Sequence, residues 1–150
     1  MMKPEITIAQ GESSITFTIA DYQYPEEKSK GDEYNYDANW LDGLFVYTDG
    51  VIHEEYRDAC LLTSELREFC EEFEKIVQGD EISYISDFME PYFKLCLLRH
   101  DDSVSIVLHF VYDTLNGIWK TRKVAETFSF DAAAEILDKL KELHSLFPKR

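Results

Sequence analysis

The chain has 150 residues, and its 30 acidic and 15 basic side chains give a formal net charge of −15. This length suits one ordinary domain, and a composition that is 45% hydrophobic and 14% aromatic is too apolar for a disordered chain. The negative field disfavours binding to nucleic acid and to anionic membranes, and it attracts basic partners. Solubility alone would also account for such a charge, so both interpretations stay open.

No apolar run approaches the ~20 residues that a membrane-spanning helix needs, and the N-terminus has no signal-peptide core. We therefore expect a cytoplasmic protein. The cysteine content agrees with a reducing compartment, because the odd count excludes complete internal pairing and no C-x-x-C pair occurs. We expect buried free thiols rather than a metal or redox site at the three cysteines, Cys60, Cys70 and Cys96.

The first third of the chain has the pattern of β-strands. Residues 14–19 alternate apolar and polar side chains, which predicts a half-buried strand, and residues 5–9 are its expected partner. Residues 40–48 and 51–62 are expected to pair across Asp49-Gly50, a dipeptide typical of tight hairpin turns.

The apolar period then changes to that of a helix. An amphipathic helix is expected to start at Thr63 or Ser64, either of which could cap it, and to end at Gly79. Its apolar stripe consists of Leu66, Phe69, Cys70, Phe73, Ile76 and Val77.

Further strands and a second helix complete the pattern. Strands are expected at residues 81–86, 92–99, 104–112 and 119–128. The second helix is expected to begin with Asp131 as its N-cap and to stop at Pro148. Short turns join most strands, so we predict an α+β fold with a largely antiparallel sheet of about seven to eight strands and two amphipathic helices packed on it.

Familiar catalytic and cofactor motifs are absent from the sequence, so no catalytic, cofactor-binding or metal-binding residue is assigned. His53 and Glu55 could share one face of a strand, but two ligands are too few for a zinc site. The cysteines lack the basic neighbours that would activate a thiolate. A small carboxylate-dependent enzyme stays an alternative, with Glu54 or Glu90 acting beside His53 or His109.

Tyrosines and carboxylates interleave in a charged, loop-like stretch before residue 38. Tyrosine supplies a large contact area at low entropic cost, and the carboxylates would suit a lysine-rich partner. The alternative is that some of these tyrosines cover the edge of the sheet. The residues predicted to contact a protein partner are Tyr24, Glu26, Glu27, Asp32, Glu33, Tyr34, Tyr36 and Asp37.

Three segments of the chain, in their order and spacing, resemble a known family. They are YDANWL at residues 36–41, RDACLLTSEL at 57–66 and FMEPYFKL at 88–95. Together they resemble the WapI family of bacterial immunity proteins. The matching residues fall where a strand or a helix is expected to start, so they look structural, and no binding residue is carried over from them.

The resemblance implies a non-enzymatic cytosolic inhibitor that binds a cognate polymorphic toxin delivered between neighbouring bacteria. The named member of the family blocks a toxin whose C-terminal domain cuts tRNA. We therefore expect the partner to be the C-terminal domain of a toxin, a basic nuclease such as a tRNase. A non-catalytic structural or regulatory subunit stays the other alternative.

Overall fold

The computed structural model describes residues 3–27 and 34–150. Its strands are β1 (Ile6–Gln10), β2 (Ser13–Tyr22), β3 (Trp40–Thr48), β4 (His53–Leu62), β5 (Ser83–Ile85), β6 (Phe93–Arg99), β7 (Ser103–Asp113) and β8 (Lys120–Ser129). Its helices are α1 (Tyr36–Asn39), α2 (Thr63–Gln78) and α3 (Phe130–Leu146), with a short 3-10 turn η1 (Leu115–Gly117) between β7 and β8.

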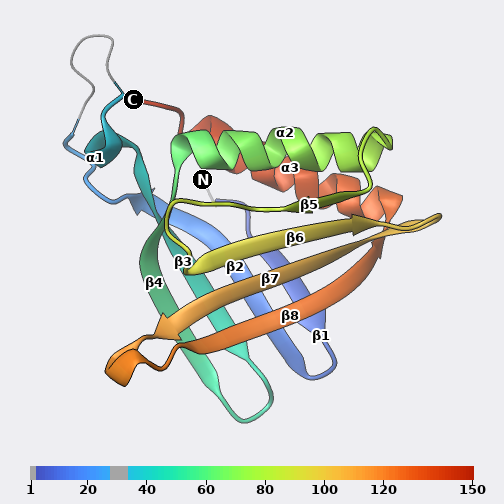
Figure 1. Cartoon of the computed structure of the whole chain (residues 1–150), viewed down its shortest axis with the longest axis horizontal. Coiled ribbons are helices and arrows are strands. Elements are labelled where there is room, and N and C mark those ends of the chain that lie inside the picture. The colour runs from blue at the N-terminus through green and yellow to red at the C-terminus, as the bar shows by residue number, and fades with distance from the viewer. Residues whose placement is uncertain (1–2, 28–33) are drawn as a thin grey trace.

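The strands form two four-stranded antiparallel sheets, each a simple meander in chain order. Helix α2 leads from β4 at the end of the first sheet to β5 at the start of the second, and α3 follows β8. The two sheets cross one behind the other, and α2 and α3 lie side by side across one end of them (Figure 1). The predicted α+β fold with antiparallel strands and two amphipathic helices is confirmed, with the strands divided between two sheets rather than one.

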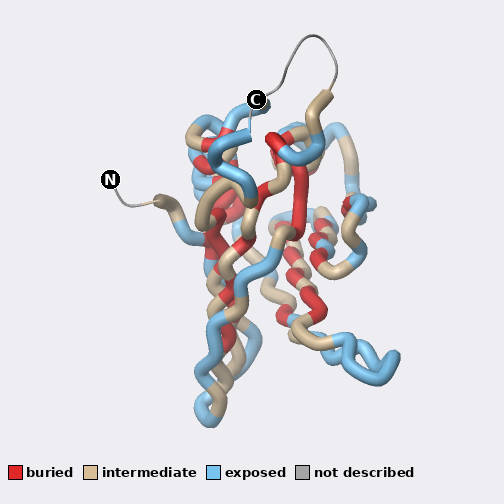
Figure 2. The backbone as a smooth tube through the Cα atoms, turned by 90° about the vertical axis from the view of Figure 1, so that its left-hand side faces the viewer, coloured by how far each residue is buried: buried red, intermediate tan, exposed pale blue. Residues whose placement is uncertain are grey.

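Phenylalanine rings from both sheets meet at the centre of the core. The Phe93 ring of β6 has its centroid 5.0 Å from that of Phe17 on β2 and 5.2 Å from that of Phe45 on β3. Phe110 of β7 stacks on Phe45 at 4.5 Å, and Phe88 stacks on Phe93 at 5.7 Å. These side chains, termed the phenylalanine cluster, hold the inner faces of the sheets together. Figure 2 shows the buried residues gathered between the layers while the hairpin tips are exposed.

The two sheets meet along one side and part along the other. At the β1–β8 side, the Glu126 carboxylate accepts a hydrogen bond from the Ala9 amide at 2.6 Å, and the Gln10 side chain accepts one from the Ala125 amide at 3.0 Å. The first sheet ends on the opposite side with β4, whose residues 53–55, 57 and 58 are exposed. Charged, exposed side chains are typical of an edge strand, because they discourage pairing with another chain.

Helix α2 starts differently from the prediction. It begins at Thr63, and the Glu65 carboxylate accepts a hydrogen bond from the Leu62 amide at 2.9 Å. The Thr63 hydroxyl instead donates to the buried Asn39 side chain at 2.7 Å. The prediction that Thr63 or Ser64 caps the helix is therefore wrong, because a tertiary contact engages the hydroxyl of Thr63.

The start of α3 is a second correction. Ser129, not Asp131, is its N-cap, and the Ser129 hydroxyl accepts a hydrogen bond from the Ala132 amide at 3.2 Å. Helix α1 was not predicted, and the side chain of Asn35 caps it. The predicted end of α2 is confirmed, because Gly79 adopts a φ of 86° that favours glycine. In the part of the chain that is described, no helix is long and apolar enough to cross a membrane.

Gly43 in β3 lies directly against the Cys60 side chain of the neighbouring strand β4. The pairing of β3 with β4 shifts between Leu41 and Asp42, and this irregularity brings in Cys60 as an extra residue. A Cβ atom at Gly43 would lie 2.5 Å from the Cys60 sulfur, and it would also crowd two rings of the phenylalanine cluster. Only glycine fits here without displacing the core.

We predict that Gly43→Ala lowers the free energy of unfolding by about 1–3 kcal/mol, the usual range for overpacking a core. Denaturant titration measures this change. The Gly43→Ala, Cys60→Ala double variant lacks the shortest contact. Its loss of unfolding free energy should therefore be about 1 kcal/mol smaller than the sum of the losses in the two single variants. Strict additivity would show that the close approach of Cys60 is not the cause.

Candidate protein-binding surface

The predicted contact residues occupy the segment between β2 and β3, here termed the tyrosine segment (residues 24–37). Tyr24 is 47% exposed and Tyr36 is 50% exposed, which is unusual for such large side chains. The carboxylates of this segment that the structure describes, Glu26, Glu27 and Asp37, are exposed as well. Asp32 and Glu33 lie outside the described residues.

Tyr34 serves partly to attach the segment to the body of the protein. Its hydroxyl lies 3.3 Å from the Ser64 hydroxyl at the start of α2, and its ring meets the Tyr36 ring edge-on at 4.9 Å. The Lys149 ammonium lies 5.6 Å from the centre of the Tyr34 ring. The partly buried Tyr34 therefore supports the exposed ring of Tyr36.

The last residue of the chain holds the beginning of the segment. The Arg150 guanidinium lies 3.7 Å from the centre of the Tyr22 ring and donates to the carbonyl oxygens of Tyr24 at 2.8 Å and Pro25 at 2.6 Å. The Arg150 amide donates to the fully buried Asn39 side chain at 3.0 Å. Residues at opposite ends of the sequence thus fix the position of Tyr24.

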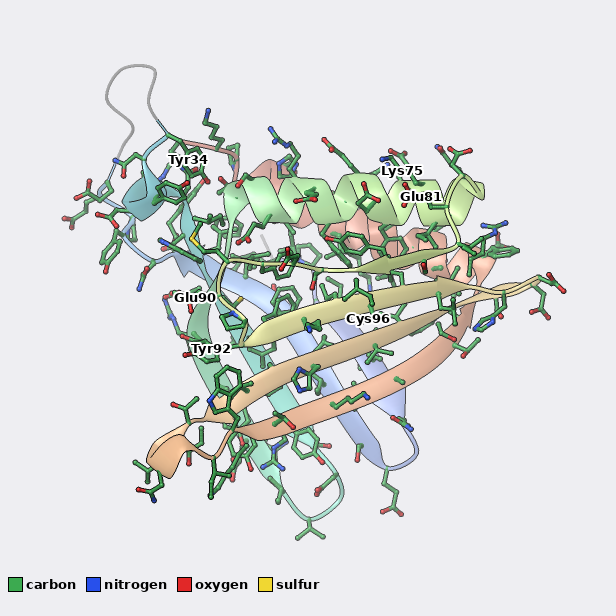
Figure 3. The ribbon with its side chains drawn as sticks, viewed as in Figure 1. Tyr34, Lys75, Glu81, Glu90, Tyr92 and Cys96 are labelled. Carbon is green, nitrogen blue, oxygen red and sulfur yellow. The ribbon has the colours of Figure 1, made fainter. Side chains whose placement is uncertain are left out.

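Beside the tyrosine segment, three adjoining hollows are all lined by Asp58 and Tyr92. The largest, of about 430 Å³, lies between β4 and the strands β6 and β7. The others have volumes of about 310 and 290 Å³, and the smaller is also lined by Gln23, Trp40 and Glu90. We term this continuous depression the Asp58 groove. Gln23 comes directly before the tyrosine segment and Trp40 shortly after it, so the groove adjoins that segment. Figure 3 shows Tyr34, Glu90 and Tyr92 along the same side of the molecule.

The Asp58 groove is electrostatically negative at its centre. The pKa of Asp58 is raised, first because the groove removes part of the hydration of its carboxyl group and then because Glu90 and Asp42 are nearby, while a hydrogen bond from the Ala59 amide opposes the rise. Asp42 is already paired with Arg57 at 2.9 Å. Among the described residues, no lysine or arginine forms an ion pair with Asp58 or Glu90.

An exposed aromatic side chain contacts Tyr92, which lines the groove, and exposed apolar residues precede it in the sequence. The Trp119 ring, 51% exposed, lies with its centroid 5.2 Å from that of Tyr92. Leu115 and Ile118, on and next to the turn η1, are 70% and 65% exposed. Exposed aromatic residues are enriched in protein interfaces, so this surface is a candidate for one.

One arginine of the chain, Arg122, contacts two aromatic side chains that line the Asp58 groove, Tyr56 and Tyr112. The Arg122 guanidinium of β8 lies 4.3 Å from the ring centre of Tyr47 and 4.4 Å from that of Tyr112. It also donates to the Tyr56 hydroxyl at 3.3 Å and pairs with Glu54 at 3.8 Å. Arg122 thereby ties β8 to the open edge of the first sheet and fixes Tyr56 and Tyr112 in the groove wall.

The three segments that carry the family resemblance converge on this surface. A hydrogen bond from Thr63 to Asn39 joins the first two, and the Glu65 carboxylate joins the second to the third by accepting the Met89 amide at 2.6 Å. Sequence reasoning treated these segments as structural, and these contacts agree. It missed that each segment also contributes to the 290 Å³ hollow, whose lining includes Trp40, Asp58, Glu90 and Tyr92.

The histidines of the alternative acid–base site lie elsewhere. His53 lies at the start of β4, opposite Thr48, and is not among the residues that line the Asp58 groove. His109 is paired with Lys94 and Lys123 across β6–β7–β8, and desolvation and then these two lysines lower its pKa. The described structure therefore does not bring Glu54 or Glu90 together with either histidine in this groove.

Among the residues that the structure describes, the cysteines and acidic side chains form no recognisable metal centre. Cys60 and Cys70 are buried free thiols as predicted, and burial raises the pKa of Cys70 to about 12. Cys96 is free but only partly buried, because it lies on the outer face of the second sheet, so the prediction of a buried thiol is wrong for this residue. Across residues 3–27 and 34–150, no group of three or more histidine, cysteine or acidic side chains could hold a metal ion.

Comparison with known proteins gives one match. A model of the immunity protein WapI-like family matches residues 5–148. No curated protein and no solved structure matches the chain significantly.

We predict that Arg122→Lys lowers the free energy of unfolding by about 1–2 kcal/mol, because a lysine ammonium cannot contact two rings, Tyr56 and Glu54 together. Chemical denaturation measures the loss. Arg67→Lys is the matched control, since Arg67 is 59% exposed on α2 and its ion pair should contribute less than about 0.5 kcal/mol. Equal effects of the two substitutions would contradict a special role for Arg122.

Proposed function

We propose that this chain, which belongs to the immunity protein WapI-like family, neutralises a cognate toxin domain by binding and occluding it. The observation that carries the proposal is the family match, which spans residues 5–148 and therefore nearly the whole chain. On this proposal the chain is a cytoplasmic inhibitor that catalyses no reaction, and it protects the cell from toxin delivered by neighbouring bacteria.

The charge of the chain supports a basic nuclease, such as a tRNase, as the toxin. A nuclease that grips RNA usually presents a basic cleft, and a protein of net charge −15 can compete for such a cleft. The charge is also unevenly placed. Lys94, His109 and Lys123 form a row across the second sheet, whereas Asp58 and Glu90 share the Asp58 groove on the side of the tyrosine segment. A basic toxin would therefore be steered toward the acidic side.

The tyrosine segment supplies the first contacts in this proposal. Tyr24 and Tyr36 project rigid aromatic surface, and Glu26 and Glu27 add charge that acts over about a Debye length of 8–10 Å. Exposed charges of this kind mainly raise the association rate, while buried aromatic anchors slow dissociation.

Co-expression tests the function directly. The C-terminal domain encoded by the large gene immediately upstream is expressed in a bacterial host with and without this chain. We expect the domain alone to stop growth and the chain to restore it. If the domain is toxic and the chain does not restore growth, the proposal is wrong for this pair.

Charge reversal distinguishes an effect of the acidic residues in the tyrosine segment from an effect of the net charge of the chain. Changing Glu26, Glu27, Asp32 and Glu33 to lysine should slow association with the purified toxin domain by about 10-fold or more at low salt. The control reverses four charges on α3, at the exposed residues Asp131, Glu135, Asp138 and Glu142. Equal slowing by both sets would show that only the net charge matters. Added salt should slow the wild-type association as well.

A further inference from the structure

The Arg122 site shows what this protein uses to bind a guanidinium group. The centres of two tyrosine rings lie 4.3 and 4.4 Å from the group, and a carboxylate and a phenolic oxygen lie near its terminal nitrogen. Such an arrangement combines cation–π attraction with charge-assisted hydrogen bonding. Arg122 satisfies this site from within the chain.

The Asp58 groove contains the same kinds of side chains, and Arg57, which lines its largest hollow, is already paired with Asp42. Asp58, Glu90 and Tyr92 line one hollow of about 290 Å³. Among the described residues, no lysine or arginine pairs with either carboxylate or lies over the Tyr92 ring. Two like charges in a partly desolvated depression repel each other, and the attraction of an incoming cation would offset both this repulsion and the cost of lost hydration.

We infer that the Asp58 groove receives an arginine side chain from the toxin domain, with its guanidinium between Asp58 and Glu90 and against the ring of Tyr92. This inference rests on the proposed function, and it assigns a specific contact to the binding of the toxin domain. Arginine is favoured over lysine because its planar group stacks on an aromatic ring while its edge binds carboxylates.

The surroundings of the hollow suit a protein loop better than a small molecule. The hollow that Asp58 and Glu90 line, of about 290 Å³, lies just below the ~300–1,000 Å³ typical of small-molecule pockets, and it is open to solvent. Trp119, Ile118 and Leu115 provide exposed apolar surface next to Tyr92 for the residues that flank the arginine. A buried charged contact surrounded by apolar contacts is typical of an interface hot spot.

The first test measures the affinity of the complete chain for the toxin domain. Asp58→Asn removes the charge and keeps the shape, so it should weaken binding by at least about tenfold, mainly through faster dissociation. Asp101→Asn makes the same chemical change in the exposed turn between β6 and β7 and should alter affinity by less than about twofold.

Folding cannot explain the expected loss. The pKa of Asp58 is raised in the unbound protein, which means that folding destabilises the charged form of its carboxyl group. Asp58→Asn removes this charge, so it should leave the thermal midpoint of unfolding unchanged or raise it. A variant that is at least as stable but binds more weakly separates recognition from structure. Tyr92→Phe keeps the aromatic ring and should bind the toxin domain nearly as well as wild type. Tyr92→Leu removes the ring and should bind more weakly.

The second test uses no toxin. N-acetyl-arginine amide is titrated into the labelled protein while the indole N–H signals of Trp40 and Trp119 are followed by NMR. Both rings adjoin the groove, so their signals should shift. The signals should not move with N-acetyl-citrulline amide, which has a similar shape and no charge, or in the Asp58→Asn variant.

The outcomes distinguish this inference from the proposed function. If wild type binds the toxin domain and Asp58→Asn binds equally well, the arginine anchor is wrong and the immunity function stands. If the indole signals respond equally to the arginine and citrulline amides, the groove has no preference for a guanidinium and the inference is overturned. If the arginine amide binds the groove but the toxin domain does not bind the chain, the proposed function is wrong.

Discussion

Packing between two antiparallel sheets through the phenylalanine cluster determines the shape of the rest of the molecule. Phe17 and Phe45 of the first sheet contact Phe93 of the second, and each such ring pair contributes about 0.5–1.5 kcal/mol beyond the area it buries. Side chains close the β1–β8 side, and the two long helices cover one end. The β4 edge is left open, so the groove is a consequence of how the sheets meet.

The open edge also explains why charged residues gather there. The first part of β4 has no strand on its outer side, and its exposed side chains are nearly all charged, which protects an edge from unwanted pairing. Arg57 and Arg122 neutralise Asp42 and Glu54, respectively. Asp58 lacks a cationic partner among the described residues, and it lies beside aromatic rings that suit a cation. On the proposed function, the charged edge that discourages pairing with another strand would also provide a carboxylate for recognition.

The predictable parts of this fold are those with a clear polar and apolar side. Ile15, Phe17 and Ile19 alternate with polar neighbours because only one face of β2 is buried, and the stripe of α2 follows the helical period. The division into two sheets was not predictable, since it depends on contacts between distant strands. The cap of α2 was missed for a similar reason, because the Thr63 hydroxyl binds Asn39, 24 residues earlier. Asp58 and Tyr92 come together only in the folded chain, so local patterns favoured the tyrosine segment alone.

Hydrogen exchange of the chain with and without the toxin domain tests the account most directly, because it maps the bound face without any substitution. We expect slower exchange in the complex at residues 54–59, 88–92 and 112–119, which surround the Asp58 groove, and in the tyrosine segment. The outer face of the second sheet, around Lys94 and Lys123, should exchange as in the unbound chain. Protection confined to that outer face or to α3 would contradict the claim that the acidic, aromatic side of the molecule binds the toxin.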